Sequence, residues 1–352
     1  MGKESVCIVG SGNWGSAISK IAGRNILNNP HQFEKRLPMW VFEETLDEKM
    51  GGGKLTDVIN EKHENVKYLP GIALPENVVA VPDVLEAVKG ATYLIFVLPH
   101  QFLGKTIEQL KGHIQPGTKG LTLIKGVDVK NDKIQIYADL IEKELGISCS
   151  SLSGANIANE VAQEKFSETT IGYRNEEEGK VWKSILDSEK FKVSLIEDVA
   201  GVSLCGALKN IVAVAAGFID GLEWGDNAKA AIMRIGLVEM KNFGLEFFDN
   251  VKSATFLEES AGVADLMTSC MGGRNRKVAE AFARTGKSFD ELEKELLGGQ
   301  KLQGAATAKE INSFLKSKKR VEAYPLFKAV YEIAYEGRDV ESIVTGVSKS
   351  KL

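Results

Sequence analysis

The sequence predicts an α/β protein with an N-terminal doubly wound parallel sheet and an all-helical C-terminal domain. In the first half, short apolar runs alternate with helical stretches, and after about residue 194 the strand signals fade while long helical segments take over. Strands that alternate with helices indicate a parallel sheet with right-handed crossovers. The length of 352 residues fits two domains, which we expect at residues 1–194 and 195–352.

The expected strands are short and almost uninterrupted in their apolar character. Such runs are typical of a sheet whose two faces are both covered by helices. The predicted strands span residues 6–9, 39–42, 93–97, 121–124 and 148–152. The first of them leads into a predicted helix at residues 14–28.

Long helices dominate the predicted C-terminal domain. They are expected at residues 199–219, 228–248, 275–285, 288–296 and 305–317. The first is apolar enough to resemble a membrane span, but it carries Lys209 near its centre and contains three glycines. Because a central charge is costly in a bilayer and glycine weakens an isolated helix, a buried core helix is favoured.

Composition excludes several classes of protein. Hydrophobic residues make up 43% and charged residues 26%, which is ordinary for a globular chain and excludes intrinsic disorder. The net charge of −4 argues against a nucleic-acid partner, because neutralising phosphates requires a basic face. The four cysteines fit no zinc-ligand spacing, so we expect no metal site and a reducing compartment. The N-terminus lacks the layout of a signal peptide.

A glycine-rich segment follows the first predicted strand and opens the first predicted helix. It reads Gly10-Ser11-Gly12-Asn13-Trp14-Gly15, a G-x-G-x-x-G pattern in the context that dinucleotide binding requires. Gly10 would allow the tight turn, Gly12 the approach of a pyrophosphate, and Gly15 close packing of the helix. The helix N-terminus would supply free N–H groups to the anion. The alternative is a glycine-rich turn without a ligand.

The end of the second predicted strand bears on the choice between NAD and NADP. A carboxylate of Glu43 or Glu44 could accept a hydrogen bond from a ribose 2′-OH and would repel a 2′-phosphate. This favours NAD, although Glu43 lies about 31 residues beyond Gly12 rather than the usual ~20. Ordinary solvation of both glutamates is the alternative.

Two aromatic residues follow strands at the edge where such sheets bind ligands. Phe42 could pack near the adenine and Phe102 near the nicotinamide or ribose, with ordinary core packing as the alternative for each. His100 has no obvious acidic partner in the sequence, so we expect a structural role for it.

Two lysines occupy positions suited to chemistry. Lys209 lies in the middle of an apolar helix, and lysine is rarely buried without a partner. Desolvation would lower its pKa into the range useful for proton transfer, whereas a snorkelling side chain with its head in water is the alternative. Lys125 follows the fourth predicted strand at its carboxyl end, where surface lysines are also common.

A second polar cluster occupies residues 264–277. If the segment is helical, Asp265 and Ser269 share a face, and the aspartate could hold a lysine ammonium. A Gly-Gly pair then introduces Arg274 and Asn275 at the start of a new helix, which suits a phosphate or a carboxylate. A solvated basic turn is the alternative.

Taken together, these segments resemble one enzyme family, the NAD-dependent glycerol-3-phosphate dehydrogenases of the eukaryotic cytosolic type. The resemblance covers nearly the whole chain. Its motifs are GSGNWG at 10–15, WVFEE at 40–44, PHQF at 99–102, LIKGVD at 123–128, SGANIA at 153–158, CGALKN at 205–210, GGRNRK at 272–277 and GQKLQG at 299–304.

The resemblance implies a Rossmann-type domain followed by a helical domain like the C-terminal domain of 6-phosphogluconate dehydrogenase. It implies reversible oxidation of sn-glycerol 3-phosphate to dihydroxyacetone phosphate, with NAD carrying the hydride. Lys209 would be the general acid/base. Lys125, Asp265 and Thr268 would orient the reacting oxygen and the ammonium group. Ser269 stands where close relatives often carry threonine.

The resemblance also implies the binding residues. Arg274 and Asn275 would hold the substrate phosphate, and Lys125 would also bind the substrate. The cofactor contacts would be the glycine-rich segment and Phe42, Phe102, Ala158, Arg274, Lys301 and Gln303.

Assembly and location follow from the same resemblance, which implies a homodimer in the cytosol. The final residues Ser350, Lys351 and Leu352 also spell a peroxisomal address, although a tail rich in serine and lysine can produce this tripeptide by chance. We therefore expect a cytoplasmic protein, with peroxisomal import as an additional prediction.

Two other functions remain open on the residues alone. One is another lysine-dependent two-domain dehydrogenase that acts on a β-hydroxy acid, against which the Gly-Gly-Arg-Asn segment argues because it suits phosphate. The other is a catalytically silent NAD sensor, against which Lys125, Lys209 and Asp265 argue because a sensor needs no proton transfer.

Overall fold

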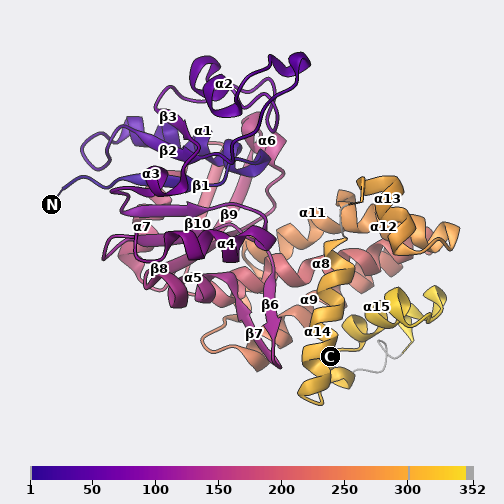
Figure 1. The fold of residues 1–352 in the computed structure, drawn as a ribbon. Helices are drawn as coiled ribbons and strands as arrows, with labels where there is room; N and C mark the ends of the chain where they lie inside the picture. Colours follow the sequence, from indigo (N-terminus) through magenta and orange to yellow (C-terminus); the bar gives the residue numbers. More distant parts are fainter. Residues whose placement is uncertain (1, 300–301, 346–352) are drawn as a thin grey trace. The chain divides into compact units, whose positions relative to one another are not determined.

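The computed structural model describes residues 2–299 and 302–345, which form two compact units (Figure 1). The units interleave in sequence. The first contains the described residues up to Ile124, Tyr137–Leu152 and Asn156–Val199, and the second contains Lys125–Ile136, Ser153–Ala155 and the described residues from Ala200 onward.

An eight-stranded sheet forms the centre of the first unit, counted over the described residues. Its strands are β1 (Val6–Val9), β2 (Leu37–Trp40), β3 (Val78–Val81), β4 (Tyr93–Phe96), β5 (Lys119–Thr122), β8 (Ser148–Ser153), β9 (Ser167–Gly172) and β10 (Phe191–Ile196). The spatial order is β10-β9-β8-β5-β4-β1-β2-β3, and the pairings from β3 through β1 and β4 to β8 are parallel. The sheet is thus doubly wound, as predicted, and its order reverses between β1 and β4.

Two sets of helices pack on this sheet. Helix α1 lies with α6 and α7, while α3, α4 and α5 form a second row. The helices of the unit are α1 (Asn13–Asn28), α2 (Leu55–Lys62), α3 (Val84–Val88), α4 (His100–Leu110), α5 (Tyr137–Leu145), α6 (Ala158–Ala162) and α7 (Glu176–Leu186), with a short 3₁₀ turn at Glu48–Met50. Asn175 caps α7 by accepting the N–H groups of Glu177 and Glu178, which would otherwise lack partners.

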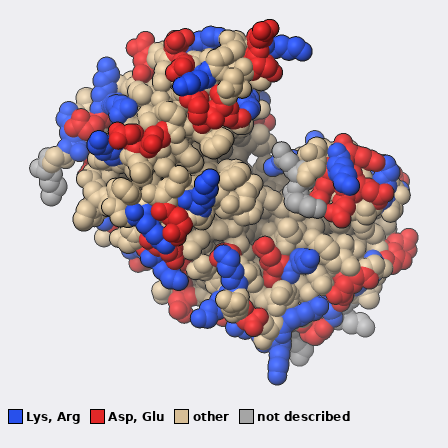
Figure 2. Space-filling view, viewed as in Figure 1, with Lys and Arg blue, Asp and Glu red and all other residues tan. Residues whose placement is uncertain are grey.

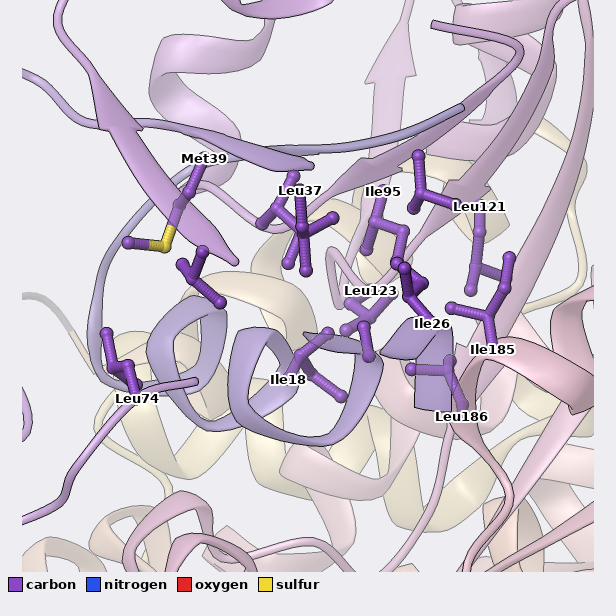
Figure 3. Close-up of a cluster of buried hydrophobic side chains, with 14 of the residues drawn as sticks. Ile18, Ile26, Leu37, Met39, Leu74, Ile95, Leu121, Leu123, Ile185 and Leu186 are labelled. Atoms are coloured by element: carbon purple, nitrogen blue, oxygen red, sulfur yellow. The ribbon is translucent and has the colours of Figure 1, made fainter. Parts of the chain in front are cut away.

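The core of the first unit lies between α1, α7 and one face of the sheet. Figure 3 shows Ile18 and Ile26 of α1 below Leu37 of β2 and Ile95 of β4, and Leu186 of α7 belongs to the same cluster. These side chains are all at most 1% exposed. Because apolar side chains fill this face of the sheet, polar groups for a ligand are expected at the carboxyl ends of the strands.

The second unit is built around helices. They are α8 (Val199–Gly221), α9 (Gly225–Phe247), α10 (Ser253–Leu257), a π turn at Ser260–Ala264, α11 (Asp265–Gly272), α12 (Arg274–Thr285), α13 (Phe289–Leu297), α14 (Gln303–Ser317) and α15 (Pro325–Tyr335), with 3₁₀ turns at Val321–Ala323 and Val340–Val344. An antiparallel hairpin of β6 (Val127–Lys130) and β7 (Lys133–Ile136) belongs to this unit and contacts α14.

Helix α8 is the one helix in the described part of the chain that is long and apolar enough to cross a membrane. The most apolar window of α8 is wholly buried inside the structure. This is the environment expected for the predicted core helix, and it places Lys209 among apolar neighbours.

The predicted elements are confirmed in position, and their ends shift by at most three residues, the largest shift being at the start of α9. The predicted strands omit β3, although its sequence VVAV is an apolar run. The apolar-run criterion itself misses β9, β10 and the β6–β7 hairpin. Strand β9 shows why, since its sequence reads SETTIG and its two central threonines are fully buried. On the face seen in Figure 2, acidic and basic side chains are interspersed.

Candidate active site

The glycine-rich segment forms the turn between β1 and α1. Gly10 has a φ of +124°, and a Cβ there would lie 2.6 Å from the carbonyl oxygen of Val97. A Cβ on Gly15 would lie 2.4 Å from the carbonyl oxygen of Gly10. Both positions therefore require glycine for the fold itself. At Gly12, by contrast, a Cβ would meet no described atom within 4 Å, so this backbone is open to a ligand.

The N-terminus of α1 is suited to an anion. No side chain caps it, and its first turn contains no acidic residue. Asn65 donates to the carbonyl of Ser11 at 2.8 Å, and Asn13 donates to the carbonyl of Tyr68 at 2.7 Å, which brace the turn. The segment lies where the strand order reverses between β1 and β4, the crevice in which doubly wound sheets bind ligands. The residues present thus fit the pyrophosphate of a dinucleotide.

Glu43 and Glu44 are both engaged within the first unit. The carboxylate of Glu43 accepts from the backbone N–H of Thr56 at 3.2 Å and from its hydroxyl, near the start of α2. Glu44 accepts from the hydroxyl of Tyr68 and pairs with Lys67. Burial acts to raise the pKa of Glu44, but these hydrogen bonds outweigh it and lower the pKa. Neither glutamate is simply solvated, and a ribose contact from Glu43 would share its carboxylate with Thr56.

The other predicted cofactor residues of the first unit occupy different positions. Phe42 follows β2 and is 71% exposed, and Phe102 lies in the first turn of α4 and is 54% exposed, so core packing does not explain them. Ala158 begins α6. His100 stacks on Tyr137 with ring centroids 5.9 Å apart, which is a packing contact.

In the second unit, Gln303 is the exposed first residue of α14. Lys301 lies outside the described residues.

Three residues from distant parts of the sequence meet in the second unit. Lys209 on α8 pairs with Oδ1 of Asp265, the first residue of α11. Lys125, which precedes β6, pairs with Oδ2 of the same carboxylate at 2.9 Å. Lys209 is 7% exposed and Asp265 2%, so the alternative of a snorkelling lysine is wrong.

Burial and charge act on this group in opposite directions. Burial lowers the pKa of Lys209 to about 8; the charge of Lys125 adds to this effect, and Asp265 opposes it. Burial acts to raise the pKa of Asp265, but the two ammonium groups outweigh it and hold the pKa below its usual value. The result is a carboxyl group whose charged form is favoured, beside an amine that can change its protonation state near neutral pH.

A second polar network lies at the start of α12, the helix that follows α11. The side chain of Asn275 accepts the backbone N–H of Gly304 at 2.8 Å and donates to Oδ1 of Asn210 at 2.9 Å. It therefore ties together α8, α12 and α14. Arg274, the first residue of α12, is exposed, and no side chain caps the N-terminus of this helix. Free N–H groups beside an arginine suit a phosphate.

The hydroxyl residues of α11 are half-buried. Thr268 and Ser269 follow Asp265 by three and four positions, so both lie on its side of the helix. The role of Thr268 stays a prediction.

Two polar residues at the site escape sequence reasoning. The hydroxyl of Ser153 donates to Oδ2 of Asp265 at 3.3 Å, and Asn210 joins the Asn275 network. Asn210 follows Lys209 directly, and Ser153 ends a strand at its carboxyl end, which is the one local signal that could have pointed to it. Within residues 2–299 and 302–345, no group of three His, Cys, Asp or Glu side chains is arranged to hold a metal ion.

Comparisons with known proteins agree over nearly the whole chain. The family models described as NAD-dependent glycerol-3-phosphate dehydrogenase N-terminus and C-terminus match residues 5–179 and 198–345. The cytoplasmic glycerol-3-phosphate dehydrogenase [NAD(+)] of Rattus norvegicus is 56% identical over 98% of this chain and 97% of its own. Glycerol-3-phosphate dehydrogenase [NAD(+)] 1 of Schizosaccharomyces pombe is 53% identical over 97% of this chain and 89% of its own. A solved glycerol-3-phosphate dehydrogenase from Saccharomyces cerevisiae superposes with a TM-score of 0.94 at 46% identity, covering 99% of this chain and 100% of that one.

Proposed function

Because the chain belongs to the family of NAD-dependent glycerol-3-phosphate dehydrogenases, we propose that it interconverts sn-glycerol 3-phosphate and dihydroxyacetone phosphate. The observation that carries this proposal is the buried ion pair of Lys209 with Asp265. A dehydrogenase needs a group that takes or returns the proton of the substrate hydroxyl, and an amine with a pKa of about 8 suits both directions.

Bound at the glycine-rich turn, NAD would supply the hydride acceptor for C2 of the alcohol, and NADH the hydride donor for the ketone. In oxidation, neutral Lys209 takes the proton of the C2 hydroxyl through Nζ. In reduction, the ammonium form of Lys209 donates that proton to the C2 oxygen. Because Lys209 is 7% exposed, water competes poorly for either form.

Asp265 and Lys125 orient this chemistry. The carboxylate of Asp265 holds Nζ of Lys209 through Oδ1 and Nζ of Lys125 through Oδ2. Lys125 is 30% exposed in its side chain, so its ammonium can also reach the substrate oxygen. Thr268, one turn along α11, would add a hydroxyl to this arrangement.

Arg274 and Asn275 would hold the substrate phosphate. Arg274 can offer its guanidinium in a bidentate contact, and the uncapped N-terminus of α12 adds backbone N–H groups. The side-chain amide of Asn275 is already engaged by Gly304 and Asn210, so its backbone N–H is the group we assign to the phosphate. A phosphate held away from C2 lets binding energy orient the reacting carbon.

The dinucleotide would bind at the glycine-rich turn of the first unit. The pyrophosphate would lie on Gly12 and the N-terminus of α1, with the rings near exposed Phe42 and Phe102. The further contacts assigned to the cofactor are Ser11, Asn13, Trp14, Ala158, Arg274, Lys301 and Gln303. In this assignment residues 1–194 bind the cofactor and residues 195–352 supply most of the substrate site.

Assembly and location complete the proposal. The protein would form a homodimer and bind no nucleic acid. It would act in the cytoplasm, because a relative such as the Rattus norvegicus enzyme is named cytoplasmic. The tripeptide at residues 350–352 lies outside the described residues, and peroxisomal import stays a prediction. A fluorescent reporter carrying this tail would remain diffuse in the cytosol if the tripeptide is not read.

The direct test is NADH oxidation with a panel of ketones. Dihydroxyacetone phosphate should be turned over well, and unphosphorylated dihydroxyacetone or β-keto acids poorly. A preference for a β-keto acid would favour the other class of dehydrogenase. NADH binding without turnover of any substrate would favour an NAD sensor.

A further inference from the structure

The carboxylate of Asp265 is held from three sides, and one of its partners has no part in the function proposed above. Oδ1 accepts from Lys209 of α8, while Oδ2 accepts from Lys125 and from the hydroxyl of Ser153, at 2.9 Å and 3.3 Å. Ser153 is the last residue of β8 and is 2% exposed.

A carboxylate needs such partners if its orientation is to be defined. Rotation of a carboxyl group about its last bond has no sharp staggered wells, so hydrogen bonds decide where its two oxygens lie. Lys125 is a long side chain and 30% exposed, which makes it a mobile anchor. Ser153 is short, buried and set at the end of a strand, and is therefore the rigid donor to Oδ2.

The segment around Ser153 forms hydrogen bonds both to Lys125 and to the π turn that precedes Asp265. The carbonyl of Gly154 accepts from Nζ of Lys125 at 3.4 Å. The backbone N–H of Ala155 donates to the hydroxyl of Ser260 at 3.4 Å. Ser260 opens the π turn that leads directly into Asp265. The backbone that carries the serine is thus tied to the element that carries the aspartate.

Gly206 leaves the space that this arrangement occupies. It lies three residues before Lys209 on α8, and therefore on the same face of the helix. A Cβ at Gly206 would lie 2.9 Å from the hydroxyl oxygen of Ser153 and 3.1 Å from Cγ of Lys125. Any larger residue would push against both donors to Oδ2.

We propose that Ser153 is a positioning residue for Asp265, and that Gly206 is required to be small so that Ser153 and Lys125 can reach the same carboxylate oxygen. The hydroxyl turns Asp265 so that Oδ1 faces Lys209. This inference rests on the roles proposed above for Lys209 and Asp265, and it assigns to Ser153 no contact with substrate or cofactor.

The first test is Ser153→Ala in the full-length enzyme. A hydrogen bond to a charged group predicts that kcat falls about ten-fold or more, while KM for dihydroxyacetone phosphate and NADH changes by less than about two-fold. Ser150→Ala is the matched control, because Ser150 is a buried serine of the same strand whose hydroxyl has no partner among the described residues. An unchanged kcat in Ser153→Ala would overturn the proposal.

The pH profile separates positioning from a general loss of structure. Asp265 raises the pKa of Lys209, so a loosened Asp265 lets that pKa fall. In Ser153→Ala, the basic limb of kcat/KM for ketone reduction should therefore move to lower pH. A lower rate with an unmoved limb would contradict action through Asp265.

Gly206→Ala tests the same contact from the other side. Alanine favours a helix interior over glycine by up to about 1 kcal/mol, which offsets part of the cost of displacing Ser153 and Lys125. The melting temperature should therefore change little compared with kcat, which should drop. Wild-type kcat in this variant would overturn the role given to Gly206.

A double-mutant cycle with Asp265→Asn distinguishes this inference from the proposed function. If Asp265→Asn keeps wild-type kcat, the proposed roles of the ion pair are wrong. If Asp265→Asn lowers kcat, adding Ser153→Ala to that variant should lower kcat further by less than about two-fold. If Ser153→Ala lowers kcat by the same factor in Asp265→Asn as in the wild type, only the positioning role of Ser153 is overturned.

Discussion

The side chain of Asn275 donates to Oδ1 of Asn210, the residue that directly follows Lys209 on α8. One of the two residues proposed to hold the phosphate is therefore hydrogen-bonded, through its side chain, to the residue next to the proposed proton donor. Asn275 also accepts the backbone N–H of Gly304 at the start of α14, and Asn210 donates to the carbonyl of Gly206 at 3.3 Å. The hydrogen bond between these two amides thus fixes α8, which carries Lys209, relative to α12, whose N-terminus would hold the phosphate.

We expect this amide pair to be energetically coupled. Asn210→Ala and Asn275→Ala should each lower the free energy of unfolding by about 1–2 kcal/mol, since each leaves a buried or half-buried partner unsatisfied. Urea unfolding of both single variants and the double variant measures the coupling. The double variant should lose clearly less than the sum, and strict additivity would show that the hydrogen bond contributes little.

Replacing Lys209 should remove catalysis and leave cofactor binding. In Lys209→Ala, kcat should fall about 10²–10⁴-fold, because the proton-transfer group is lost. The dissociation constant for NADH, measured by fluorescence titration, should stay near the wild-type value. An equal loss of NADH affinity would instead assign Lys209 to the cofactor site or to folding.

The direction of the reaction should decide how the rate depends on pH. With a Lys209 pKa of about 8, ketone reduction needs the ammonium form, so its kcat/KM should be level below that pH and fall above it. Alcohol oxidation needs the neutral amine and should rise up to the same pH. Lys125→Met should move both limbs to higher pH, because the charge of Lys125 lowers the pKa of Lys209. Limbs that stay in place would contradict this assignment.

Arg274 should matter most for phosphorylated substrates. In Arg274→Ala, KM for dihydroxyacetone phosphate should rise about ten- to hundred-fold, as expected for a lost charged hydrogen bond. The weak activity with unphosphorylated dihydroxyacetone should change little. Arg284→Ala is the matched control, since Arg284 lies on the same helix and pairs with Glu280 and Glu223. Equal effects on both substrates would refute the phosphate contact.

Glu239 should make stability depend on pH. It is 1% exposed and accepts the backbone N–H groups of Leu326 and Phe327 at the start of α15. Burial raises its pKa to about 7, against the opposing effect of these hydrogen bonds. Because the folded pKa exceeds the unfolded value, this group favours folding below about pH 4.5 and loses that contribution as the pH rises through about 7.

Urea unfolding between pH 4.5 and 8 measures this contribution. Glu239→Gln should flatten the pH dependence of the free energy of unfolding over that range. An unaltered pH dependence in the variant would assign it to other groups.

Some features could be predicted because their causes are local. The glycine-rich turn follows from a positive φ at Gly10 and the close approach of Gly15, which leave few other residues possible. Strands such as β1 and β4 are buried along their whole length and show as apolar runs. Strand β9 is buried except at Glu168, but its polar serine and threonine residues mean that a criterion based on apolar character does not detect it.

The doubly wound sheet, the dinucleotide turn and the helix that carries Lys209 could all be predicted from the amino-acid sequence, because backbone geometry and apolar periodicity depend on neighbouring residues. The folded arrangement was needed to show that Lys209 is desolvated and paired with Asp265, 56 residues away. It was also needed to show that Ser153, 112 residues before Asp265, donates to the same carboxylate. The pKa of a side chain and the orientation of a carboxylate depend on neighbours that packing brings together, and no local pattern records them.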